Sequence, residues 1–246
     1  MIDTHAHINK FYYPNIDEIL EQALLNGIEK IIVPGTSLQD SRDNQKFENN
    51  MLFYAIGIHP ETQDVVTREV LEKIYSPEII AIGECGLDYY YKYTTPEEQE
   101  KKFRVQIEYA IEKKLPLIVH TREALQDTYN ILSDYYKNGD SDKGVIHSAA
   151  GDIKILEKIE NLGFYLSFNG ISTFHNAQNI RDIIFDTDTS KILIETDSPF
   201  LSPVPVRNQK QNSPSNIKYI LENIQDIKGK DLQKIIYNNS KKLFNI

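Results

Sequence analysis

Short apolar runs recur along the chain, and helical patterns separate several of them. A strand that is buried on both faces reads as a nearly unbroken run of hydrophobic residues. Eight segments fit this description, and they cover residues 1–2, 30–34, 52–58, 79–83, 115–119, 144–146, 164–168 and 192–194. The pattern therefore predicts eight short parallel strands.

Helix signals lie between or after these runs. Thr95 and Pro96 begin the clearest helix, because threonine caps a helix and proline suits its first turn. From there to Lys114, apolar residues return at helical spacing. Similar patterns predict helices over residues 16–26, 152–161, 214–227 and 230–244. Strands that alternate with helices form a parallel sheet, and eight such units close into a (β/α)₈ barrel. An open, doubly wound sheet is the alternative.

Composition limits the class of protein. The 246 residues suit one α/β barrel domain over 1–246, and 40% hydrophobic residues can form a core. The net charge of −9 argues against bulk electrostatic binding of nucleic acid, although local basic contacts stay open. A single cysteine and the lack of a signal peptide or long apolar run suggest a cytoplasmic protein. We therefore expect no membrane association, and no obligatory protein partner is evident.

Five of the six histidines follow the predicted strands, and they are His5, His7, His59, His120 and His147. The carboxyl ends of barrel strands meet at one mouth, where active sites form. His5 and His7 are two residues apart, so on a strand both imidazoles point the same way. Glu84 and Asp197 stand at matching positions after apolar runs. These side chains are expected to converge.

Six of these residues form a candidate metal site: His5, His7, Glu84, His120, His147 and Asp197. Six ligands exceed the needs of one four-coordinate ion and suit two divalent ions that share a bridging carboxylate, most naturally Glu84. Such a pair of ions can activate water and stabilise phosphoryl oxygens. Mixed imidazole and carboxylate ligands fit Zn²⁺, Mn²⁺, Fe²⁺ or Ni²⁺, and Mg²⁺ would favour the carboxylate-rich half. The role of Glu195 stays open.

The motifs around these residues span nearly the whole chain. They are DTHAH at 3–7, GIHP at 57–60, GECGLDYY at 83–90, VHTREA at 119–124, HSAAGD at 147–152, GFYLSFNGISTF at 163–174 and ETDSPFL at 195–201. As an ordered set, they resemble the TatD family of metal-dependent deoxyribonucleases, within the amidohydrolase superfamily. The resemblance implies a distorted (β/α)₈ barrel that hydrolyses phosphodiester bonds in DNA with bound divalent ions.

The resemblance also implies roles for single residues. One family metal site matches His5, His7, Glu84 and Asp197, and the other matches Glu84, His120 and His147. Asp197 would also act as the general base toward the attacking water. His59 matches a position near the phosphate, whereas Arg122 and Arg207 match positions around the substrate.

Four features depart from the family pattern, and none involves the six ligands. Cys85 replaces an aliphatic residue, and we expect it in the core. His175 replaces a lysine or arginine, which removes a permanent positive charge. Val206 stands in a lengthened loop where histidine is frequent, and the segment at 147–151 has small residues where an aromatic one is typical.

The tyrosines after Glu84 allow two interpretations. Tyr89 and its neighbours Tyr90 and Tyr91 either stack against bases or pack the barrel rim. Few basic residues border the predicted mouth: Lys92, Arg122, Arg207 and Lys210. This modest number favours 3′ ends or single strands of DNA over long duplexes.

Two other functions are considered. A hydrolase of another small phosphoester or an amide could use the same barrel, but many such relatives carry a carboxylated lysine at the end of the fourth strand. Glu84 occupies that place, which favours the nuclease without excluding other phosphoesters. A non-catalytic binding barrel would be indicated by a lost ligand, and all six are present.

Overall fold

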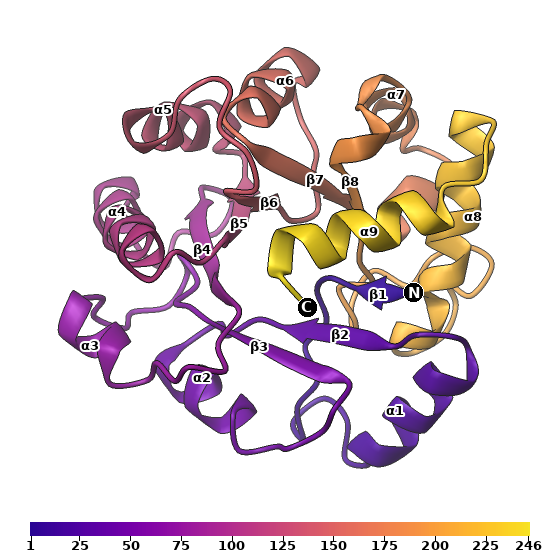
Figure 1. Ribbon diagram of the computed structural model, residues 1–246, viewed down its shortest axis with the longest axis horizontal. Helices are drawn as coiled ribbons and strands as arrows, with labels where there is room; N and C mark the ends of the chain where they lie inside the picture. Colours follow the sequence, from indigo (N-terminus) through magenta and orange to yellow (C-terminus); the bar gives the residue numbers. More distant parts are fainter.

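Eight parallel strands pair in sequence order in the computed structural model, which describes residues 1–246 (Figure 1). They are β1 (Ile2–Asp3), β2 (Lys30–Val33), β3 (Leu52–Ile56), β4 (Ala81–Asp88), β5 (Leu117–Arg122), β6 (Gly144–Ile146), β7 (Phe164–Phe168) and β8 (Ile192–Ile194). The first and last strands also meet, because the backbone N–H and the hydroxyl of Thr4 both donate to the carbonyl of Ile194, at 3.2 and 2.9 Å. The result is a nearly closed barrel, so the predicted fold class is confirmed and the open sheet is wrong.

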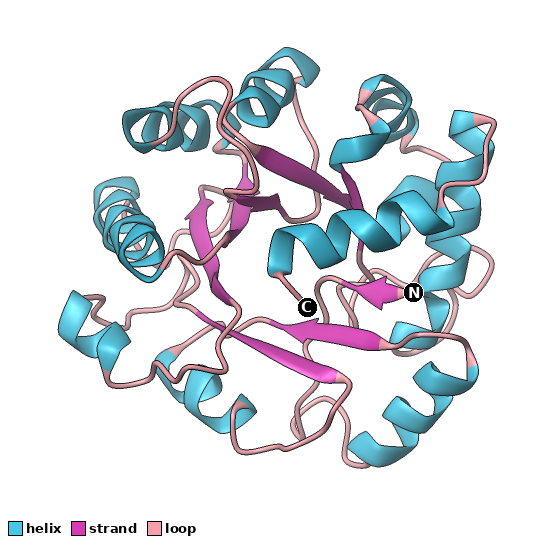
Figure 2. Cartoon of the chain, in the orientation of Figure 1, coloured by secondary structure: helices cyan, strands magenta, loops and turns pink.

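The chain has nine α-helices, of which α1 to α8 lie around the strands (Figure 2). They are α1 (Ile16–Leu25), α2 (Leu38–Asn44), α3 (Arg68–Glu72), α4 (Pro96–Lys113), α5 (Leu125–Tyr135), α6 (Ile153–Asn161), α7 (Gln178–Asp186), α8 (Ile217–Lys228) and α9 (Gln233–Phe244). Three short 3₁₀ helices, η1 (Gly170–Thr173), η2 (Thr189–Lys191) and η3 (Pro214–Asn216), lie in the connections. No helix combines the length and the apolar character that crossing a bilayer requires.

The barrel interior is a layer of apolar side chains to which each strand from β2 to β8 contributes one. The layer contains Ile32, Ala55, Ala81, Ile118, Val145, Tyr165 and Leu193. Leu243 and Phe244 of α9 complete it, and Figure 1 shows α9 lying across the barrel with the C-terminus near its axis. Helix α9 therefore closes the end that lies opposite the mouth.

Several of the candidate site residues lie two or four residues after this layer in the sequence, toward the mouth of the barrel. On β5, Ile118 is followed two residues later by His120, and on β6 Val145 is followed by His147. Because side chains alternate along a strand, these histidines face the same interior as the apolar layer. Two residues after Leu193 of the layer comes Glu195, and two residues after that comes Asp197. The interior face of the strands thus becomes a polar site at the mouth.

Close approach between β3 and β4 depends on glycine. A Cβ built on Gly57 would lie only 2.3 Å from the carbonyl carbon of Gly83, directly before Glu84. Any side chain at residue 57 would therefore push the strand that carries Glu84 outward. Several strand boundaries differ from the prediction, and two of the differences affect the site: β4 continues to Asp88 and β5 continues to Arg122. Glu84 and His120 consequently lie within strands, not after them.

Candidate metal centre

The six predicted ligands come together at the carboxyl ends of the strands. Their ligand atoms form three overlapping groups, each with all atoms within 4.8 Å: His5, His7 and Asp197; His5, Glu84 and His147; and His59, Glu84 and His120. Every predicted ligand belongs to at least one group. His59, which was expected near the phosphate, also faces Glu84.

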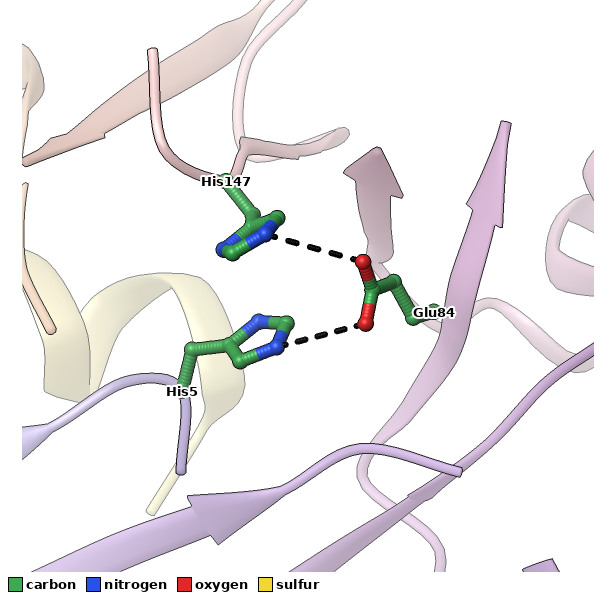
Figure 3. Close-up of side chains that lie close together, drawn as sticks. All are labelled: His5, Glu84 and His147. Atoms are coloured by element: carbon green, nitrogen blue, oxygen red, sulfur yellow. Dashed lines mark ion pairs between the residues drawn. The ribbon is translucent and has the colours of Figure 1, made fainter. Parts of the chain in front are cut away.

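Glu84 occupies the middle of the cluster. Figure 3 shows the rings of His5 and His147 both facing its carboxylate. The Nε2 atom of His5 lies 3.4 Å from Oε2, and that of His147 lies 3.6 Å from Oε1. The two rings are stacked, with their centroids 3.8 Å apart. Oε1 also lies 2.8 Å from Nδ1 of His120, so the two oxygens of one carboxylate face different sets of imidazoles.

The side of the cluster that β1 and β8 supply holds His5, His7 and Asp197. The Nε2 atoms of His5 and His7 approach to 3.3 Å. Oδ1 of Asp197 lies 3.4 Å from the His7 nitrogen and 3.7 Å from the His5 nitrogen. Two imidazole nitrogens and a carboxylate oxygen thus converge on one small space, which is an arrangement that a cation stabilises.

Two further carboxylates contact the ring nitrogens of His147 and His120 that do not face Glu84. Oε1 of Glu195 lies 2.8 Å from Nδ1 of His147, and Oδ2 of Asp88 lies 2.9 Å from Nε2 of His120. A carboxylate on one ring nitrogen fixes the ring and directs its other nitrogen toward the centre. Sequence reasoning left Glu195 open and did not find Asp88. The signal for Glu195 was its place on the interior face, one strand period before Asp197.

Asp3 connects β1 to the segment that follows β8. Its carboxylate accepts hydrogen bonds from the backbone N–H of Thr196 at 2.9 Å and from the hydroxyl of Thr196 at 2.5 Å. It also accepts one from the backbone N–H of His5 at 3.3 Å. Complete burial raises the pKa of Asp3 to about 7. This residue therefore fixes the relative positions of His5 and Asp197.

The cluster favours positive charge. Burial opposes the ionisation of Glu84, yet the charges of His147 and His5 hold its pKa well below its usual range. Burial also favours neutral imidazole, but Glu195 and Glu84 outweigh it and raise the pKa of His147 to about 10. Carboxylates are thus kept ionised while an imidazole is driven to take up a proton. Divalent cations would supply the same charge, so the donor set fits metal ions.

A cleft of about 840 Å³ opens above the cluster. His59 and Arg122, two of the predicted substrate contacts, line it together with Tyr91 and Tyr93. Tyr89 does not line it, because its hydroxyl donates to Asp127 on α5 at 3.1 Å. Its contact with substrate stays a prediction.

The predicted basic contacts stack on aromatic rings. The guanidinium of Arg122 lies 3.7 Å from the ring centre of Tyr90, and that of Arg207 lies 3.4 Å from the ring centre of Phe174. Arg207 lies outside the residues that line the cleft. Cys85 is buried in the main hydrophobic core, as expected. His175 is exposed.

Comparison with known proteins connects this geometry to a family. Residues 2–245 match the family described as TatD related DNase. An uncharacterized metal-dependent hydrolase of Buchnera aphidicola, BU355, is 35% identical, and the match covers 100% of this chain and 99% of the relative. The 3′-5′ ssDNA/RNA exonuclease TatD of Escherichia fergusonii is 29% identical, with 94% and 93% covered. The crystal structure of YjjV, a TatD homolog from Escherichia coli, superposes with a TM-score of 0.87 at 25% identity and covers 100% of this chain and 98% of that one.

Proposed function

The chain belongs to the TatD family of metal-dependent hydrolases, and from that premise we propose that it is a nuclease that hydrolyses phosphodiester bonds in DNA. The main support is the position of Glu84, whose two carboxylate oxygens face His5 on one side and His120 on the other. A carboxylate shared in this way suits two neighbouring divalent ions, which is a common arrangement for phosphoester hydrolysis. The E. fergusonii relative, by its name, acts on single-stranded DNA and RNA, which supports a preference for 3′ ends or single strands.

The donor set would suit two ions. His5, His7, Asp197 and Glu84 would hold a first ion, and Glu84, His120 and His147 would hold a second. When bound, Mg²⁺, Mn²⁺ or Zn²⁺ would polarise water and neutralise charge on the phosphate.

Asp197 is the proposed general base. Burial raises its pKa, but the hydrogen bond from His7 and the nearby imidazoles outweigh burial and lower it. Its carboxylate is therefore ionised at neutral pH and can accept the proton of the attacking water. His59 lines the cleft, and burial lowers its pKa to about 3. It stays neutral, and because its Nδ1 accepts a hydrogen bond from the backbone N–H of Glu61 at 3.3 Å, its proton lies on Nε2, 3.5 Å from Oε1 of Glu84. Its place in the cleft supports a position near the phosphate.

Arg122 and Arg207 are the proposed phosphate contacts. Neither guanidinium forms an ion pair or a hydrogen bond within the chain, and the face of each lies against an aromatic ring. Stacking holds the plane of the group while its edge keeps the N–H donors free, which is the geometry that binds phosphate. With so few free cations around the mouth, a short or single-stranded segment is the expected DNA substrate.

Labelled DNA tests the proposal directly. We expect the wild type, supplied with Mg²⁺ or Mn²⁺, to shorten an end-labelled single strand, and a chelator to stop it. Asp197→Asn should keep the fold by circular dichroism and lose activity by orders of magnitude, because it removes both a ligand charge and the base. If the wild type cleaves small phosphoesters but no DNA, the second candidate, a hydrolase of small phosphoesters, replaces the nuclease.

A further inference from the structure

Exposed aromatic side chains gather at the mouth of the barrel. Six aromatic residues are exposed, and five of them lie in loops that follow β1, β4 and β8: Phe11, Tyr90, Tyr91, Tyr93 and Phe200. The sixth, Phe185, lies near the end of α7, close to where β8 begins and so toward the opposite end of the barrel. Exposed apolar surface that is concentrated beside one site indicates that the site binds something apolar.

Three of the rings at the mouth form a continuous series that leads away from a metal ligand. The ring of Phe200 lies 5.8 Å from that of His7, Tyr12 lies 5.5 Å from Phe200, and Phe11 lies 5.0 Å from Tyr12. Each contact is edge to face, which is a favourable geometry for aromatic pairs. We call Phe11, Tyr12 and Phe200 the aromatic platform. Its outer member, Phe11, is 86% exposed.

The backbone holds this platform in place although its outer ring is not buried. The side-chain oxygen of Asn9 accepts hydrogen bonds from the backbone N–H groups of Phe11 and Tyr12, at 3.1 and 3.2 Å. The amide of Gln211 donates to the carbonyl of Tyr12 at 2.7 Å and so connects the loops after β1 and β8. An ordered backbone lowers the entropy cost of binding a ligand there.

The rest of the cleft favours an uncharged, flat ligand at this place. Phe11, Tyr12 and Phe200 line the same cleft as Tyr91 and Tyr93, which come from the loop after β4, four strands away from β8 in the barrel. The carboxylate of Asp40 also lines it and accepts a hydrogen bond from the side chain of Asn9, beside the platform, at 3.5 Å. It would repel a phosphate at this place but would not repel a neutral ring. A nucleobase satisfies these conditions, provided that it is unpaired and unstacked from its neighbours.

We propose that the aromatic platform stacks an unpaired nucleobase next to the phosphodiester held at the metal centre. The inference rests on the proposed nuclease function and assigns it a base-binding subsite. Phe11 is exposed and therefore open to a ligand, and Tyr12 and Phe200 connect it to His7. Loss of one stacking ring typically weakens binding of a base by about tenfold.

The test compares natural and abasic ends. The two substrates are single-stranded oligothymidylates of equal length, one of which lacks the bases of the last two nucleotides at each end. The phosphates are the same in both, so the ratio of the two kcat/KM values for the first cleavage measures base recognition alone. We expect wild type to favour the natural end by about tenfold, and Phe11→Ala to bring the ratio toward one. Phe11→Trp should restore it.

The control is Phe185→Ala, which removes a phenylalanine that is 66% exposed, far from the mouth. Its ratio should match that of the wild type. A wild-type ratio near one, or a ratio that Phe11→Ala leaves unchanged, would overturn base stacking on the platform and leave the nuclease proposal intact. Absence of cleavage of both oligonucleotides by the wild type would overturn both proposals.

Discussion

At the scale of single residues, carboxylates outside the proposed ligand set orient the histidines of the site. His147 has one nitrogen toward Glu84 and the other on Glu195, and Glu195 itself accepts a hydrogen bond from the backbone N–H of Ser148 at 2.8 Å. The amide of Asn169 donates to the same oxygen at 3.3 Å. Three donors on one buried oxygen leave Glu195 little freedom to move. It therefore fixes the tautomer and the direction of the His147 ring.

Replacing Glu195 by glutamine tests this support. The amide keeps the shape of the side chain but loses the charge that orients His147, so we expect metal affinity to fall by about 10–100-fold. Isothermal titration with Mn²⁺ on the purified variant would measure the change. Glu157→Gln, on the exposed side of α6, is the matched control and should bind like the wild type. Equal affinity in the two variants would show that Glu195 is not a positioning residue.

The same scale shows what the sequence could and could not reveal about the site. The common mouth of a barrel was enough to predict that His120 and His147 converge with Glu84. Asp88 was not found because β4 continues past the apolar run. Gln99 of α4 holds the end of this extension. Its side-chain oxygen accepts a hydrogen bond from the backbone N–H of Asp88, and its side-chain nitrogen donates one to the carbonyl of Asp88, both at 2.8 Å. No local pattern contains this tertiary contact.

At the scale of elements, the strands were easier to predict than the helices. All eight strands were predicted, because each is a short apolar run. Helices α5 and α7 were not identified individually, and neither has a side-chain hydrogen bond at its N-cap, since Ala124 and Ala177 stand there. Helix α2 is only seven residues long and mostly polar. These helices are stabilised by packing against the barrel, which sequence signals for isolated helices do not report.

Helix α6 carries a half-buried carboxyl group that makes stability depend on pH. Burial, only partly offset by Lys191, raises the pKa of Glu160 from 4.5 to about 7. The folded state therefore binds this proton more tightly than the unfolded state. The resulting stability is fully present below about pH 4.5 and is lost as the pH rises through 7.

Glu160→Gln should remove that dependence. At pH 8 we expect the variant to exceed the wild type by about 1 kcal/mol in the free energy of unfolding, and at pH 4.5 we expect little difference. Urea unfolding at both pH values measures this, and comparison with the wild type cancels all other titrating groups. Glu157→Gln should change stability little at either pH. If the difference in unfolding free energy between variant and wild type were the same at both pH values, ionisation of Glu160 would not be its cause.

Helix α9 makes a separate contribution, because it closes the barrel opposite the mouth. Phe244 is buried in the interior layer. Phe244→Ala leaves a cavity there, and we expect a loss of about 3–4 kcal/mol in the free energy of unfolding. Phe185→Ala, at an exposed position of the same residue type, should cost less than about 0.5 kcal/mol. Urea unfolding measures both changes. Similar losses of unfolding free energy in the two variants would argue against closure of the barrel by α9.

At the scale of the whole molecule, the proposed metal centre joins distant parts of the chain. Its proposed ligands extend from His5 to Asp197, and they come from β4, β5 and the ends of β1, β6 and β8. In the unfolded chain these groups are far apart, so divalent ions should bind the folded state much more strongly. Bound ions would then stabilise the entire barrel, in addition to any part in catalysis.

This linkage predicts a melting temperature that depends on metal concentration. Free Mn²⁺ at one hundred times its dissociation constant should stabilise the fold by about 2.7 kcal/mol for each bound ion, which for a chain of this size corresponds to roughly 5–11 °C per ion. Thermal unfolding followed by circular dichroism, in chelator and then at increasing Mn²⁺, measures the shift. In His5→Ala the shift should shrink, because one ligand of the first ion is gone. If the variant gained as much as the wild type, Mn²⁺ would be acting elsewhere, and His5 would not be a ligand.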